Sequence, residues 1–426
     1  MNTRRTTAHS GPMTKEVVVA RPEIVSAGEL TTLQAQVRVG GEKTNILFRS
    51  DRLVEPRASG DPFLATLLLP AMKLGAALRI DAPVSVELLS STETIQQIFR
   101  KWDPDLSIVD VIAEPKEVTG GRPPAKASFF SGGVDSFYTA LKHQQSLDAV
   151  VFVHGFDIRL GNAGLRQRVS AEMKRAATGL GMDLIEVETN LREFCDPIVS
   201  WPNHQFGPAM ASVAHALSGT LATIYFPSSE SYAHLDPCAS HPLVDPLWGT
   251  NALTVIHDGA EASRNEKVEL IASTEITRTT LRVCWENPAN AYNCGRCEKC
   301  LRTMINLESV GALKYFDVFD NSLDLQAVEK ISIPSDLVYF HIEENLRVLR
   351  ERGGDPALIS ALGNAVNSYR AERAVGALLA VPRLPRHTPG LDRLAWQHGP
   401  ALVKALFRAG TANLAAAASA LLRRAS

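Results

Sequence analysis

The stretch ASFFSGGVDSFYTALKH, residues 127–143, decides how the middle of this 426-residue chain is expected to fold. An apolar run ends at Phe130, and a Ser-Gly-Gly turn follows it. Beyond the turn, Val134, Phe137 and Leu141 recur at the spacing of one helix face. The stretch therefore predicts a strand, a tight turn and a helix.

The turn has two interpretations. It can be an ordinary Gly-Gly turn in which Asp135 and Ser136 begin the helix. It can also be a cradle for the phosphates of ATP, because a helix N-terminus presents unpaired N–H groups and positive partial charge. In that case Gly132 and Gly133 let a phosphate approach the backbone, and Ser131 adds a hydroxyl donor, as does Ser136. Asp135 would repel a bare phosphate, so we expect it to hold Mg²⁺.

The glycines match neither of two common nucleotide motifs. G-x-x-x-x-G-K-[ST] is absent here, which excludes the usual P-loop, and the stretch is not G-x-G-x-x-G, so a dinucleotide fold is not indicated.

Apolar strands alternate with helical segments after residue 127. The strand candidates are residues 148–157, 183–189, 221–229 and 252–260, and the helix candidates between them are residues 165–181 and 208–219. Near-continuous apolar strands between helices predict an α/β fold with a parallel sheet covered on both faces. Ligands bind beyond the carboxyl ends of such strands. The Ser-Gly-Gly turn, Asp157, residues 228–230 and residues 258–259 all fall at such ends, which predicts one shared cleft.

Four of the six cysteines form a C-x₉-C-x₂-C-x₂-C cluster at Cys284, Cys294, Cys297 and Cys300. Four thiolates suit tetrahedral Zn²⁺ and leave no open position, so we expect a structural zinc knuckle. An iron–sulfur cluster is the less favoured alternative. The clustering indicates a reducing compartment, and we expect a cytoplasmic protein.

The strand, the S-G-G-V-D-S turn and the helix together resemble the PP-loop ATP pyrophosphatases, over about Ala127 to Leu307. The cysteine rhythm brings the resemblance nearest to the 7-cyano-7-deazaguanine synthase-like proteins. The resemblance implies a sheet of the HUP/PP-loop type and cleavage of ATP between its α and β phosphates. It implies adenylation of a carboxylate or carbonyl oxygen, followed by displacement of AMP by nitrogen, in an ATP-dependent ligase.

The same resemblance implies the site. The cofactors would be ATP, Mg²⁺ and Zn²⁺. The nucleotide-binding residues would be Ser131, Gly132, Gly133, Val134, Asp135, Ser136, Asp157 and Arg264, and the catalytic residues Asp135 and Lys267. For Arg264 and Lys267 an equal alternative is a solvated charge pair with Glu266 or Glu269.

Two other functions stay open. Sulfur transfer to an RNA base would need a thiol outside the cluster, for which Cys195 and Cys238 are the candidates. A non-catalytic nucleotide-binding interaction protein is the second alternative. Since position 2 is Asn2, the chain shows no N-terminal-nucleophile glutaminase, and nitrogen would come from ammonia, an amine or a donor protein.

The chain departs from the resemblance at both ends and in a wide segment between Gly219 and Asp258. We therefore expect a small-molecule acceptor of its own. The expected parts are residues 1–120 (an N-terminal α+β module), 121–283 (the PP-loop domain), 284–325 (the zinc segment with its following helix) and 326–426 (a mainly helical region). In the first part we expect strands within residues 16–50, helices over 63–78 and 82–102, and a strand over 106–114.

Weaker signals concern partners and histidines. The formal net charge of −2 indicates no bulk attraction for nucleic acid, and a homo-oligomer is compatible with the sequence. The N-terminus lacks an apolar signal region, and no apolar run reaches a membrane span. His154 and His215 are expected to be core histidines. The loop over residues 229–250, with His234, Asp236, His241 and Asp245, is expected to be a substrate-binding or surface loop rather than a metal site.

Overall fold

The computed structural model describes residues 16–119, 125–319 and 322–380. The N-terminal leader, the centre of the expected Gly/Pro linker, the Pro-rich break over 381–390 and the basic tail over 399–426 lie outside the described residues. The chain divides into two compact units. The first comprises residues 1–294 with 312–321, and the second comprises residues 295–311 with 322–426.

The first unit is built on one mixed sheet, eleven-stranded in the described residues, with the order β11-β10-β7-β8-β9-β4-β3-β1-β5-β6 and with β2 paired to β3 outside this path. The strands are β1 (Glu16–Val19), β2 (Glu23–Ala27), β3 (Leu30–Val39), β4 (Glu42–Ser50), β5 (Ala77–Ser85), β6 (Val111–Lys116), β7 (Ala125–Phe129), β8 (Ala149–His154), β9 (Asp183–Thr189), β10 (Leu221–Pro227) and β11 (Thr254–Asp258). Strands β7 to β11 pair in parallel, as the apolar strand pattern predicts. All six residues of β8 are buried, as expected for the interior of a covered parallel sheet.

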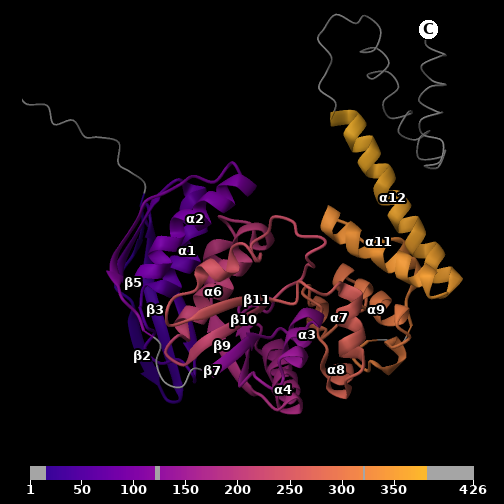
Figure 1. Ribbon diagram of the computed structural model, residues 1–426, viewed down its shortest axis with the longest axis horizontal. Coiled ribbons are helices and arrows are strands. Elements are labelled where there is room, and N and C mark those ends of the chain that lie inside the picture. The colour runs from indigo at the N-terminus through magenta and orange to yellow at the C-terminus, as the bar shows by residue number, and fades with distance from the viewer. Residues whose placement is uncertain (1–15, 120–124, 320–321, 381–426) are drawn as a thin grey trace, which may run out of the picture. The chain divides into compact units, whose positions relative to one another are not determined.

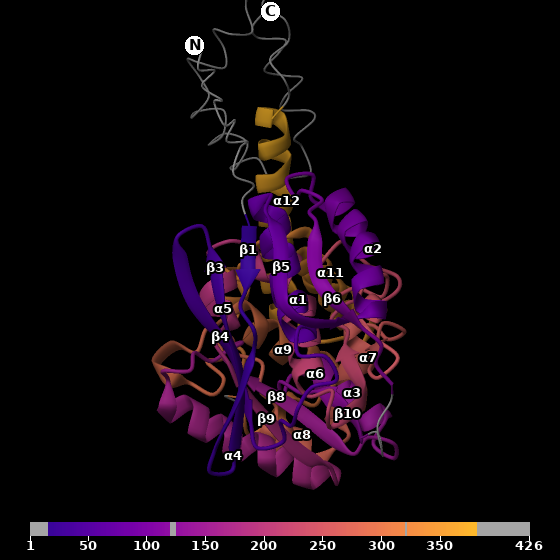
Figure 2. The ribbon, with the colours of Figure 1, turned by 90° about the vertical axis from the view of Figure 1, so that its left-hand side faces the viewer.

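The N-terminal strands continue this same sheet. Strand β4 pairs antiparallel with β9 through Phe48–Thr189 and Arg49–Glu188, and β3 and β4 form a long hairpin beside it (Figure 2). Residues 16–116 and the parallel strands therefore share one compact unit.

Helices cover both faces of the parallel strands (Figure 1). The helices of this unit are α1 (Asp61–Leu74), α2 (Val86–Trp102), α3 (Val134–Lys142), α4 (Ala163–Leu180), α5 (Leu191–Cys195), α6 (Phe206–Ala216), α7 (Arg264–Ala272) and α8 (Glu275–Thr280). At the end of β11, the Asp258 carboxylate bonds residues of α3, whereas the preceding His257 bonds Asp245 of the 3₁₀ turn Asp245–Trp248. Successive strand residues face opposite sides, so α3 lies on one face and this turn, which contacts α6, on the other.

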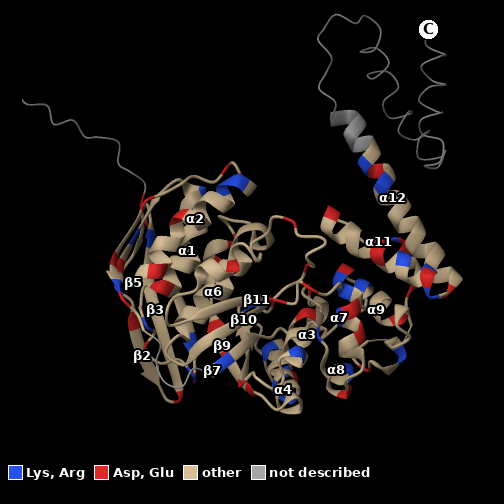
Figure 3. Ribbon diagram, in the orientation of Figure 1, with Lys and Arg blue, Asp and Glu red and all other residues tan. Residues whose placement is uncertain are grey.

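The second unit is helical in its described part. It contains α9 (Glu298–Ser309), α10 (Leu325–Glu329), α11 (Asp336–Glu351) and α12 (Pro356–Ala380). Leu301 and Ile305 of α9 pack in one core with Ile342 of α11 and Leu362 of α12. Lys and Arg are interspersed with Asp and Glu along α11 and α12 (Figure 3).

Three expected elements of the N-terminal part are wrong at their boundaries. The helix predicted over 82–102 begins only at Val86, because residues 77–85 form β5. Leu78, Ile80 and Val84 are buried alternately along that strand, so its period is two rather than 3.6. The helix predicted over 63–78 ends at Leu74, where Gly75 adopts φ 60° as a left-handed cap. The strand predicted over 106–114 starts at Val111.

Across the described residues, no helix combines the length and apolar character needed to span a membrane.

Candidate functional site

The carboxyl ends of β7, β8, β10 and β11 lie at one edge of the sheet, because these strands are parallel neighbours. The backbone N–H of Ser228, after β10, donates to the carbonyl of Asp258 at 2.7 Å. After β7, Phe130 donates its N–H to the carbonyl of Val151 at 2.8 Å. The loops that the sequence places at this edge are therefore joined by backbone hydrogen bonds.

The Ser-Gly-Gly turn joins β7 to α3. Gly132 has φ +76°, and a Cβ there would lie 2.6 Å from Cε of Met173. Its missing side chain thus serves the backbone conformation and close packing. Gly133 is the N-cap residue of α3, its N–H donates to Oγ of Ser131 at 3.3 Å, and Ser136 donates its hydroxyl to the Gly133 carbonyl at 3.0 Å.

Two cations converge on Asp135 in the first turn of α3. A guanidinium nitrogen of Arg264 donates to Oδ2 of Asp135 at 2.8 Å, and Nζ of Lys267 lies 3.5 Å from Oδ1. Arg264 and Lys267 are 8% and 1% exposed, so they are not a solvated charge pair. Both stand at the start of α7, which Ser263 opens with a capping box.

Lys267 also ties this group to the end of β10. Its ammonium donates to the carbonyl of Ser228 at 2.7 Å. Helices α3 and α7 contact one another, so the Ser-Gly-Gly turn and the two cations belong to one constellation. Two basic side chains beside a helix N-terminus make this edge a suitable place for an anion.

A second segment lies along the other side of the turn. The backbone N–H of Arg282 donates to the carbonyl of Gly132 at 2.7 Å, and Asn287 donates its side-chain N–H to the carbonyl of Asp157 at 2.9 Å. A guanidinium nitrogen of Arg282 in turn donates to Oδ1 of Asn287 at 2.7 Å. The sequence reasoning missed Arg282 and Asn287, since neither belongs to a motif and both are defined by contacts with residues 125 or more positions away.

Asp258, which also ends a strand, belongs to a separate polar network. Its carboxylate accepts hydrogen bonds from Thr139 at 2.9 Å and Lys142 at 3.0 Å, and lies 2.9 Å from Nε2 of His143. Lys142 also pairs with Glu261. Burial opposes the ionised form of Glu261, but the hydrogen bond from Lys142 outweighs it and lowers the pKa of Glu261 to about 2. This network fastens α3 to the end of β11.

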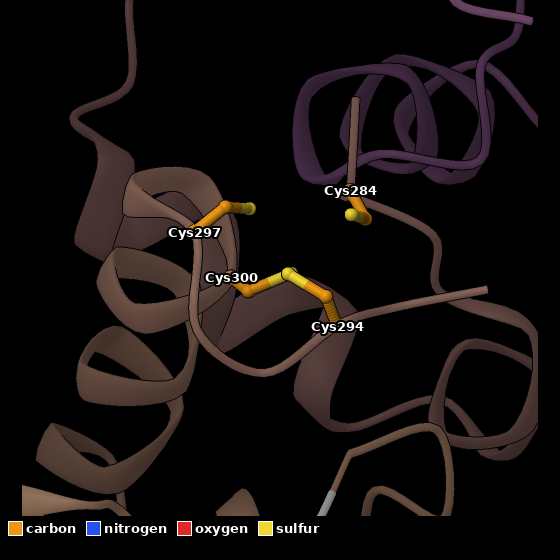
Figure 4. Close-up of side chains that lie close together, drawn as sticks. All are labelled: Cys284, Cys294, Cys297 and Cys300. Carbon is orange, nitrogen blue, oxygen red and sulfur yellow. The ribbon is translucent and has the colours of Figure 1, made fainter. Parts of the chain in front are cut away.

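The four clustered cysteines come together as the sequence predicts. Their sulfurs all lie within 4.8 Å of one another, and the side chains of Cys284, Cys294, Cys297 and Cys300 turn toward a common centre (Figure 4). None of the four is in a disulfide. In the described part of the chain this is the one cluster of at least three metal-binding side chains, and a four-thiol set fits Zn²⁺.

Asn293 holds the backbone around this cluster. Its side-chain oxygen accepts the N–H groups of Val283 at 2.9 Å and Cys284 at 3.2 Å, and its side-chain nitrogen donates to the carbonyl of Leu281 at 2.9 Å. One amide side chain therefore fixes the strand-like segment that carries the first cysteine.

The two remaining thiols are poorly suited to sulfur chemistry. Cys195 is completely buried, and burial raises the pKa of its thiol. Burial also raises the pKa of Cys238 to about 12, and its sulfur donates to the carbonyl of Ser240 at 3.0 Å. Neither is a ready thiolate at neutral pH.

The histidine expectations can be compared directly. His154 and His215 are 3% and 1% exposed, and each has a partner, which confirms them as core histidines. In the loop before β11, Asp245 is fully buried and accepts a hydrogen bond from Ser240 while binding Nδ1 of His257 at 2.7 Å. These contacts order the loop and form no metal site with His234 or Asp236.

No protein-family model, curated protein or solved structure matches the chain.

Proposed function

We propose that the chain is an ATP-dependent enzyme that adenylates a carboxylate or carbonyl oxygen for attack by a nitrogen nucleophile, releasing pyrophosphate and then AMP. The parallel strands would then form a sheet of the HUP/PP-loop type. The observation that carries the proposal is the convergence of two buried cations, Arg264 and Lys267, on the S-G-G-V-D-S turn at a helix N-terminus.

The residues divide the work by position. The backbone of the Ser131–Gly133 turn and the start of α3 would hold the β and γ phosphates. Arg264 and Lys267 would neutralise the charge that develops on the leaving pyrophosphate. Asp135 positions both cations in the absence of ligand. The reaction would be accelerated by orientation and charge neutralisation, without a covalent nucleophile.

The residues present do not form a Mg²⁺ site of their own. Each carboxylate oxygen of Asp135 already faces a cation, and the described chain brings no second carboxylate into a metal-binding group with it. We therefore assign charge neutralisation to Arg264 and Lys267 and route no step through Mg²⁺.

Zn²⁺ would have a structural role. Four cysteines complete a tetrahedral shell, so a bound ion would hold the segments that carry them and would leave no position for a reacting group.

The test is exchange of labelled pyrophosphate into ATP, measured with a panel of heteroaromatic carboxylic acids in the absence of ammonia. Acid-dependent exchange shows formation of an acyl adenylate, and adding ammonia should then release AMP. We expect Lys267→Met to reduce exchange at least about 100-fold, the range found when one group aimed at developing charge is removed. The matched control is Arg175→Gln, since Arg175 is a half-exposed arginine paired with Glu172.

Two results would contradict the proposal. If the chain binds ATP but no acid or carbonyl compound supports exchange or AMP formation, it is a non-catalytic nucleotide-binding protein. If Lys267→Met exchanges like the parent chain, the assigned role of the cations is wrong.

A further inference from the structure

Arg282 is a buried arginine without a carboxylate partner. It is 2% exposed, and among the described residues it forms no ion pair. Its one side-chain hydrogen bond is the bond to the amide oxygen of Asn287, and its Nε is buried with no partner. A buried charge of this kind is costly unless an opposite charge accompanies it.

Other buried cations of the chain are compensated. Arg264 and Lys267 share the carboxylate of Asp135, and in α9 the guanidinium of Arg302 lies 2.6 Å from Glu298. The contrast shows what Arg282 lacks: a negative group within the reach of its guanidinium.

The place of Arg282 indicates where that group would come from. Its N–H bonds the Gly132 carbonyl, its carbonyl oxygen lies 3.6 Å from the Cβ position of Gly133, and its side chain reaches Asn287, which bonds the Asp157 loop. Arg282 therefore lies against the N-terminus of the nine-residue helix α3, where unpaired N–H groups also favour an anion. The helix end and the uncompensated arginine are independent observations that point to the same ligand chemistry.

We infer that Arg282 binds an oxyanion at the Ser-Gly-Gly turn, namely a phosphate group of the nucleotide, on the side of the turn opposite Arg264 and Lys267. The inference rests on the proposed function for the identity of the ligand as a nucleotide. The anion subsite itself requires no turnover. Cations would then flank the turn on both sides, with Asp135 offsetting the charge on one side alone.

A purely structural role for Arg282 makes the opposite prediction for stability. If its hydrogen bond to Asn287 were its purpose, removing the guanidinium would destabilise the ligand-free chain. If an anion is its partner, the ligand-free chain carries the cost of a lone buried charge, and Arg282→Gln should unfold at the same temperature as the parent chain or higher.

The experiment uses the full chain with Arg282→Gln and Arg282→Lys, and Arg175→Gln as control. Isothermal titration calorimetry with pyrophosphate, ATP and adenosine separates phosphate binding from base binding, and thermal unfolding is recorded with and without each ligand. We expect Arg282→Gln to weaken pyrophosphate and ATP binding about 10- to 100-fold, as for a lost charge-assisted hydrogen bond, and to leave adenosine affinity unchanged. Arg282→Lys should fall between the two, because it keeps the charge and loses the guanidinium geometry.

Several outcomes would overturn the inference. They are unchanged pyrophosphate affinity in Arg282→Gln, failure of the parent chain to bind pyrophosphate, and loss of folding in both Arg282 variants. The proposed function is judged separately by acid-dependent exchange. Arg282-dependent pyrophosphate binding without any exchange would leave this inference standing and refute that proposal.

Discussion

Gly132 shows how much a single residue of the turn has to satisfy. Its φ of +76° is a conformation that costs other residues about 1–2 kcal/mol, and a Cβ would press on Met173. We expect Gly132→Ala to lower the free energy of unfolding by about 1–2 kcal/mol, measured by urea denaturation. Met173 can move its terminal methyl aside, so most of the loss should come from the backbone.

The matched control is Gly161→Ala, because nothing lies within 4 Å of a Cβ at Gly161 and its φ is not positive. This variant should be within about 0.5 kcal/mol of the parent chain. Equal unfolding curves for the two variants would contradict the conformational argument.

Residues of the candidate site differ in how far the sequence could predict them. The Ser131–Ser136 turn is a local string, and its place between strand and helix is visible in the sequence. Arg264 and Lys267 could be proposed as a basic pair, but their common partner Asp135 lies about 130 positions earlier. Arg282 had no signal, because its significance comes from burial without a carboxylate, which exists only in the folded chain.

Strands β4 and β9 form the junction between the N-terminal strands and the parallel strands. Only two residue pairs join them, and Glu188 of β9 accepts hydrogen bonds from Arg49 of β4 and from Arg166 of α4. Those hydrogen bonds outweigh burial, the largest effect on Glu188, and lower the pKa of its carboxyl. The carboxylate therefore compensates two arginines at a short strand pairing.

We expect Glu188→Gln to lower the free energy of unfolding by about 1–3 kcal/mol, since it leaves Arg49 and Arg166 close together without their shared carboxylate. Urea denaturation measures the change. Glu193→Gln, an exposed site in the next helix, is the control and should be nearly silent. An equally small effect at Glu188 would show that backbone pairing alone holds the junction.

Elements were predictable where their period was unmistakable. The parallel strands stand out because an unbroken apolar run such as β8 fits a covered sheet. The segment before α2 was misassigned, because ALRIDAPVS passes directly into VELLS without a turn residue. The start of α2 is instead decided by a distant contact: Asp61 accepts the backbone N–H of Ser85 at 2.7 Å.

Titratable groups of the first unit together predict the response of the chain to pH. Burial lowers the pKa of His204, His215 and His241, so the unfolded chain binds protons more readily and stability falls below about pH 6.5. In Glu186, hydrogen bonds from His154 and Ser170 outweigh burial and lower its pKa, as they do in Glu188 and Glu261 through other partners. The stability that these carboxylates contribute is complete above about pH 4.5 and is lost as the pH falls through their folded pKa values.

We therefore expect the free energy of unfolding to decrease steadily from pH 7 to pH 4, measured by urea titration at each pH. Asp61 works in the opposite direction, because burial raises its pKa, but it is one group against six. Glu261→Gln should flatten the curve only below about pH 4.5. A stability maximum near pH 4 would contradict the assignment.

The metal centre gives the last prediction for the molecule as a whole. Four free thiols within 4.8 Å of one another repel as thiolates unless a cation joins them, so folding and metal binding should be linked. We expect one Zn²⁺ per chain by elemental analysis, and we expect a strong chelator to lower the unfolding temperature. Cys300→Ser should lose the ion because a structural site needs its fourth ligand. Cys238→Ser, outside the cluster, should keep it. Iron in place of zinc would favour the alternative cluster chemistry, and full zinc occupancy in Cys300→Ser would show that the four cysteines are not a single site.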